Sequence, residues 1–102
     1  MHYYNINIPV GNILGKNLEY NFVAMQRNIV GTRVRQARKS ATPQISQVDL
    51  VARLQLLGMK IEQSGISKIE QGYRPVSDVE VAALAKALKV SAAWLLGETN
   101  TP

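Results

Sequence analysis

Apolar residues after Val30 recur at helical spacing in five short segments, and polar breaks separate each segment from the next. A chain of 102 residues with 46% hydrophobic residues can bury one modest core. No strand pattern, internal repeat or low-complexity tract follows residue 30. We therefore expect an all-α fold, a five-helix bundle preceded by an irregular N-terminal extension.

The first two helices are bounded by recognisable start and stop residues. Pro43 ends an apolar stripe that predicts a helix over residues 29–41. Ser46 is a good N-cap and Gly58 a natural C-terminal stop, so the second helix is expected over 47–57. The stripe of the first helix is Val30, Val34, Ala37 and Ala41, and the broad apolar face of the second is Val48, Leu50, Val51, Leu54 and Leu57.

Three shorter segments complete the bundle. Ile66 and Ile69 mark a third helix over residues 63–71, which gives way to a loop around Pro75. Ser77 and Glu80 form a capping box that opens the fourth helix, over 78–89. Ser91 caps a final short helix, in which Trp94 and Leu95 are expected to close the core.

Residues 1–28 differ in composition from the rest and hold three of the four tyrosines. The stretch "YNINIPVG" alternates like a short strand and stops at Pro9 and Gly11. Two interpretations are open for this extension: a poorly ordered end, or an arm that packs on the domain or on a second copy. The expected domains are thus 1–28 as the extension, 29–98 as the helical domain and 99–102 as a tail.

Composition argues against catalysis. The chain has no cysteine and a single histidine, His2, so neither a thiolate metal site nor a histidine-based triad can form. No phosphate-binding Gly-rich motif is present, and Asp78 and Glu80 are better interpreted as acids of a helix first turn. We expect a protein that is not an enzyme and needs no cofactor or metal.

Charge and hydropathy indicate the kind of partner. Twelve Lys and Arg residues against seven Asp and Glu residues give a net charge of +5, which favours a polyanion such as nucleic acid or an anionic membrane surface. No signal peptide and no uninterrupted apolar stretch of membrane-spanning length occurs. A soluble, cytoplasmic protein is expected.

Four ordered motifs now narrow the family. They are "VGTRVRQARKS", "ISQVDLVARL", "SGISKIEQGYRPVSDVEVAALAKALKV" and "SAAWLLG". Together they resemble the Xre/Cro-type, lambda-repressor-like helix-turn-helix domain of bacterial regulators, over residues from about Ile29 to Glu98. The segment "LQLLGMKIE" is longer than the usual family turn, and so, slightly, is "SATPQIS" between the first two helices.

The resemblance implies a set of DNA contacts on the third helix and around it. Gln, Ser and Lys side chains can hydrogen-bond to base edges, and Lys or Arg side chains can neutralise phosphates. The implied base contacts are Gln63, Ser64, Ser67 and Lys68. Gln47 is implied to contact a phosphate or the reading helix. The remaining backbone candidates come from charge: five basic residues and no acidic one lie from Arg27 to Val48. From this run and the loop after the third helix, the candidates are Arg33, Arg35, Lys39 and Arg74.

Glu70 is a carboxylate in a helix that should approach phosphates. In the resembled family this acid pairs with an Arg of the first helix, and Arg38 holds the matching position here. The Arg38–Glu70 pair is therefore expected to be a structural brace.

The implied function is a transcriptional regulator, expected to be a repressor, that binds an inverted-repeat operator in double-stranded DNA as a homodimer. Leu95 and Leu96 of the last helix, or the N-terminal arm, could supply the dimer surface. The alternative is a protein-interaction module, antitoxin-like or a subunit of another regulator, with weak or secondary DNA binding. The longer turn and Glu62, near the start of the third helix, favour this alternative.

Overall fold

The computed structural model describes residues 26–102, and within this range the chain forms five α-helices and no strand. They are α3 (Gly31–Ser40), α4 (Gln47–Leu56), α5 (Gln63–Glu70), α6 (Asp78–Leu88) and α7 (Ala92–Leu95). The all-α class and the order of the helices are confirmed, and each end lies within two residues of its expected position. The short strand and the arm expected before residue 26 fall outside the described residues.

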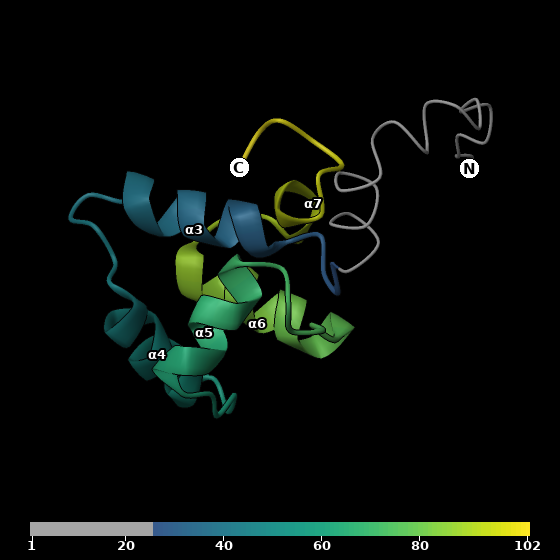
Figure 1. The fold of residues 1–102 in the computed structure, drawn as a ribbon. Coiled ribbons are helices and arrows are strands. Elements are labelled where there is room, and N and C mark those ends of the chain that lie inside the picture. The colour runs from purple at the N-terminus through teal and green to yellow at the C-terminus, as the bar shows by residue number, and fades with distance from the viewer. Residues whose placement is uncertain (1–25) are drawn as a thin grey trace.

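The bundle is built around α5 and α6. Figure 1 shows α3 and α7 on one side of this pair and α4 on the other, and the packing contacts agree with this arrangement. Trp94 and Leu95 are 5% and 0% exposed, as expected for residues that close the core. The largest fully buried side chains, which come from every helix and the residue before α3, are Val30, Val34, Leu50, Leu54, Ile66, Ile69, Leu84 and Leu95.

The buried part of the broad apolar face of α4 is narrow. Leu50 and Leu54 are fully buried, whereas Val48 is 59% and Leu57 46% exposed. Among the described helices, α5 and α6 pack most on α4, and they leave Val48 and Leu57 in contact with solvent. Val51 packs at the edge of the core.

Side-chain caps fix where three helices begin. The capping box of Ser77 and Glu80 at α6 is confirmed, and the Ser91 hydroxyl accepts a hydrogen bond from the Trp94 N–H. Ser46 caps α4 as expected, and Asp49 completes a second capping box there because its carboxylate accepts from the Ser46 N–H. The helix starts therefore follow from local chemistry.

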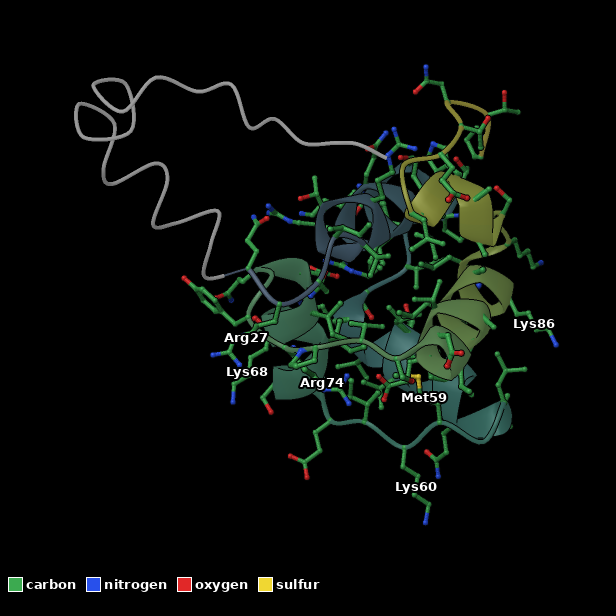
Figure 2. The ribbon with its side chains drawn as sticks, turned by 90° about the vertical axis from the view of Figure 1, so that its right-hand side faces the viewer. Arg27, Met59, Lys60, Lys68, Arg74 and Lys86 are labelled. Carbon is green, nitrogen blue, oxygen red and sulfur yellow. The ribbon has the colours of Figure 1, made fainter. Side chains whose placement is uncertain are left out.

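The link over residues 57–62 begins with a Schellman motif that ends α4. Gly58 adopts a left-handed φ of 89°, and the N–H of Met59 donates to the Leu54 carbonyl at 2.9 Å. Met59 is 9% exposed and lies against the helices, while Lys60 points away from them (Figure 2). The longer link is thus anchored to the core at its second and third residues.

Asn28 fastens the start of α3 to the other end of α5. Its Oδ1 accepts hydrogen bonds from the N–H groups of Val30 and Gly31, and its Nδ2 donates to the carbonyls of Ile69 and Arg74. The sequence interpretation placed Asn28 in the extension, but these four bonds tie it to the domain.

Gly31 packs directly against the backbone at the end of α5. A Cβ atom built on Gly31 would clash with the Ile69 carbonyl oxygen, a backbone atom that cannot move alone. We expect Gly31→Ala to lower the free energy of unfolding by about 3 kcal/mol, because the two helices must separate. Denaturant titration measures the loss. The exposed neighbour supplies the control, Thr32→Ala, and an equally small effect for both variants would contradict the close-approach argument.

Candidate nucleic-acid interface

The Arg38–Glu70 ion pair is present and joins α3 to α5. Arg38 Nε donates to Glu70 Oε2 at 2.6 Å and Arg38 Nη2 donates to Glu70 Oε1 at 2.9 Å, so the contact is bidentate. A third donor, Arg38 Nη1, donates to the Ile45 carbonyl at 3.0 Å. Arg38 is only 7% exposed, and hydrogen bonding to Glu70 raises the pKa of its guanidinium above the ordinary value. Glu70 is therefore a paired internal charge that faces Arg38 across the α3–α5 contact.

Two glutamine side chains extend this pair to the start of α5. Gln47 Nε2 donates to Glu70 Oε1 at 3.1 Å, and Gln63 Nε2 donates to Gln47 Oε1 at 3.3 Å. Gln47 is the first residue of α4, and Gln63 is the first residue of α5. The chain of hydrogen bonds thus connects three helices and holds Gln63 in place from behind.

The exposed face of α5 carries the expected polar residues. Gln63, Ser64 and Lys68 are exposed and Ser67 is half-buried, while Ile66 and Ile69 are fully buried on the opposite face. Gln71 was not among the predicted site residues, yet its Nε2 donates to the Ser67 hydroxyl at 2.9 Å. The spacing of four residues between Ser67 and Gln71 is the sequence signal that could have indicated it.

A polar cleft of about 420 Å³ lies where α3, α4 and α5 meet. Arg35 and Lys39 line its α3 side; they are four residues apart and share a helix face. Since the charges of Arg38 and Glu70 neutralise each other, Arg35 and Lys39 give this cleft a positive rim. The remaining lining residues are Gln47, Ser67 and Gln71.

Arg33 lies on a different face of α3 from Arg35 and Lys39. Its Nη1 donates to the carbonyls of Trp94 and Thr99 at 2.7 and 2.8 Å, and its guanidinium lies 4.8 Å from the centre of the Trp94 ring. Residues two apart on a helix do not share a face, so the structure does not bring Arg33 to the cleft. Arg33 fastens α7 and the tail to α3 instead.

Arg74, in the loop before α6, forms an ion pair with Glu80 in the first turn of α6. Its guanidinium donates from Nη1 to Glu80 Oε1 at 3.1 Å and from Nη2 to Glu80 Oε2 at 3.0 Å. These bonds, with a smaller contribution from the Ser77 N–H, hold the pKa of Glu80 below its ordinary value. The positive charge of Arg74 is therefore matched locally.

The described residues hold neither a cluster of metal ligands nor a membrane-spanning helix. Within residues 26–102, no group of three or more His, Asp or Glu side chains could hold a metal ion. Among the helices of the same range, none has the length and apolar character needed to cross a membrane.

The Arg38–Glu70 pair can be tested by a double-mutant cycle with Arg38→Met and Glu70→Gln. Each single change should lower the free energy of unfolding by about 3 kcal/mol, because it leaves a buried polar partner without its match. The double variant should lose less than the sum, giving a coupling energy of about 2 kcal/mol. Thermal or denaturant unfolding provides the four values. Lys39→Met, on the exposed side of the same turn, is the control, and a coupling energy near zero would contradict the brace.

One comparison with known proteins gives a match. The family model described as helix-turn-helix matches residues 34–95, which is more than half of the 102 residues. The search of curated proteins and the search of solved structures found no significant match.

Proposed function

The chain belongs to the Xre/Cro-type, lambda-repressor-like helix-turn-helix family, and on this premise we propose that it is a sequence-specific repressor of transcription. The observation that carries the proposal is the exposed polar face of α5, supported from behind by the Arg38–Glu70–Gln47–Gln63 chain of hydrogen bonds. A side chain already held in place loses less conformational entropy when it binds a base.

The proposed base contacts are the four residues expected from the sequence. The Gln63 amide offers a donor and an acceptor that match adenine N7 and N6, and Lys68 reaches guanine O6 and N7. Ser64 and Ser67 carry hydroxyls that can donate to or accept from either kind of base. An α-helix fits the major groove of B-DNA, and Gln63, Ser64 and Lys68 on this face of α5 are exposed.

The backbone contacts proposed for the neighbouring elements are narrower than the set expected from the sequence. Arg35 and Lys39 line the positive cleft beside α5, and Gln47 opens α4 at the same place. We leave out Arg33, whose guanidinium lies on Trp94, and Arg74, whose charge is matched by Glu80. The DNA phosphates that flank the major groove entered by α5 would contact Arg35 and Lys39 first.

A gel-shift titration on the DNA upstream of the protein's own gene tests the proposal. Wild-type protein should bind this duplex specifically, and the Gln63→Ala/Lys68→Ala variant should bind about tenfold or more weakly, because each lost base contact costs about 1–3 kcal/mol. Binding should also weaken as salt rises from about 50 to 200 mM, because phosphate contacts release counterions.

The matched control for the gel shift is Gln55→Ala/Lys86→Ala, which removes the same two residue types from exposed positions of α4 and α6. It should bind as the wild type does. Equal binding by both double variants would exclude α5 as the reading helix.

Repression by this protein would require two copies, since an inverted repeat presents two half-sites related by a two-fold axis. The surface proposed for pairing is an apolar groove of about 430 Å³, which includes Val76, Val81 and Leu96 in its lining. Ile29, which also lines the groove, is 72% exposed, so a second copy would cover apolar surface that water now meets.

The groove joins the segment that leads into α3 to α6 and to the end of α7, because Ile29, Val81 and Leu96 all line it. Leu95, proposed from the sequence as a dimer residue, is fully buried and cannot take part, whereas Leu96 can.

Ile29→Asp tests the dimer surface, because Ile29 lines the groove and is exposed. A carboxylate in a buried interface is strongly unfavourable, so the variant should be monomeric at concentrations where the wild type is a dimer. Light scattering gives the mass, and circular dichroism checks that the helices are kept. Leu56→Asp is the matched control, because Leu56 is 88% exposed on α4 and lies outside the groove. Retention of the dimer by Ile29→Asp would reject this surface.

The rival function, a protein-interaction module, rested on the longer link before α5 and on Glu62. The link is anchored by Met59, and α4 and α5 remain packed on each other. Glu62 is exposed and precedes α5, where a carboxylate favours the positive end of the helix dipole. A wild-type protein that binds no duplex but co-purifies with another protein would support the rival.

A further inference from the structure

The chain before α3 brings an additional cation to the C-terminal end of α5. The N–H of Arg27 donates to the Gly72 carbonyl at 2.7 Å, and Gly72 follows the last turn of α5. Figure 2 shows the side chains of Arg27 and Lys68 on the same side of the molecule, with Lys86 on the opposite side. Arg27 is separated from Lys68 by 41 residues in sequence, so no local pattern joins them.

The backbone of Arg27 is held in a fixed position. Asn28, the next residue, makes four hydrogen bonds to the start of α3 and to the carbonyls of Ile69 and Arg74. Together with the hydrogen bond from Arg27 to Gly72, these bonds attach the backbone of Arg27 and Asn28 to the C-terminal end of α5. The position of the Arg27 backbone is therefore fixed relative to α5.

The guanidinium of Arg27 differs in its surroundings from those of Arg33, Arg38 and Arg74. Arg27 is exposed, and the ion pairs found among residues 26–102 join Arg38 to Glu70 and Arg74 to Glu80. Arg33 lies on the Trp94 ring. Within the described part of the chain, Arg27 thus keeps a charge that is not matched by a neighbouring carboxylate.

We infer that Arg27 is a phosphate-contacting residue, which extends the DNA interface beyond the C-terminal end of α5 to the strand that borders the major groove. The inference rests on the proposed function of α5. The groove is about 12 Å wide, so a long side chain placed past the end of a helix within it meets the flanking backbone before it meets base edges. Arg27 lies outside the family match over residues 34–95.

The experiment measures the salt dependence of binding to a short fluorescent DNA duplex of mixed sequence, which needs no knowledge of the operator. Arg27→Gln should make the slope of log affinity against log salt shallower by about 0.9, the value for one lost phosphate contact. The advantage of wild type over the variant should therefore shrink about threefold between about 50 and 200 mM salt. The loss should be the same on other duplex sequences, because phosphates carry no sequence information.

Two further variants keep the result interpretable. Arg27→Lys should restore the slope, since a lysine can also neutralise a phosphate. Lys86→Gln removes the same charge from the far side of the molecule and should leave the slope unchanged. Thermal unfolding of Arg27→Gln should match that of the wild type, because the changed side chain is exposed.

The outcomes separate this inference from the function on which it rests. A wild-type protein that binds no duplex overturns the proposed function. A wild type that binds, with Arg27→Gln and Lys86→Gln showing the same slope as it does, overturns the role of Arg27 alone.

Discussion

The bidentate contact between Arg38 and Glu70 is the interaction on which the orientation of α5 depends. Both side chains are nearly excluded from water, with 9% and 5% of their side-chain surfaces exposed. A buried charge is tolerated only when its hydrogen-bonding capacity is met, and here Arg38 reaches Ile45 while Glu70 also accepts from Gln47. Any rotation of α5 about its axis would break this set of bonds together. The acid in the middle of α5, the helix proposed to face DNA, is thereby explained as a fixed internal partner.

A second constraint acts at the other end of the same contact. The lack of a side chain at Gly31 lets α3 approach the Ile69 carbonyl, and Asn28 donates to that same oxygen. The Arg38 contact fixes how α5 is rotated, and the Gly31 contact fixes how far it lies from α3. Since α4 holds α5 from the opposite side, the polar face of α5 is presented by a rigid support.

What the sequence could predict follows from the range of the interactions involved. The helix starts at Ser46, Ser77 and Ser91 are set by bonds that reach three residues, so local patterns suffice to place them. The clamp formed by Asn28 joins residues 41 and 46 positions away, and no local pattern indicates it. The Arg38–Glu70 pair is also distant in sequence, and it was expected only because the family resemblance supplied the partner.

Arg33 and Val48 show the same limit within single helices. Counting the basic residues of α3 placed Arg33 with Arg35 and Lys39, although a helix turns its residues by about 100° per position. Likewise, an apolar stripe in α4 indicates a buried face but does not say how many helices will cover it. In both cases the missing information was the tertiary neighbour, Trp94 for Arg33 and solvent for Val48.

The longer link before α5 need not alter how the domain docks. Lengthening a loop costs little free energy, about 0.6 kcal/mol for each doubling of its length. The added residues are bounded by Met59, which is buried, and by Ile61, which packs on the core, so only Lys60 points away between them. Because Arg38, Gly31 and Asn28 all hold α5 through residues that follow the link, its orientation is determined after the insertion. In the proposed complex with DNA, the orientation of α5 would therefore depend on α3 far more than on the turn that precedes α5.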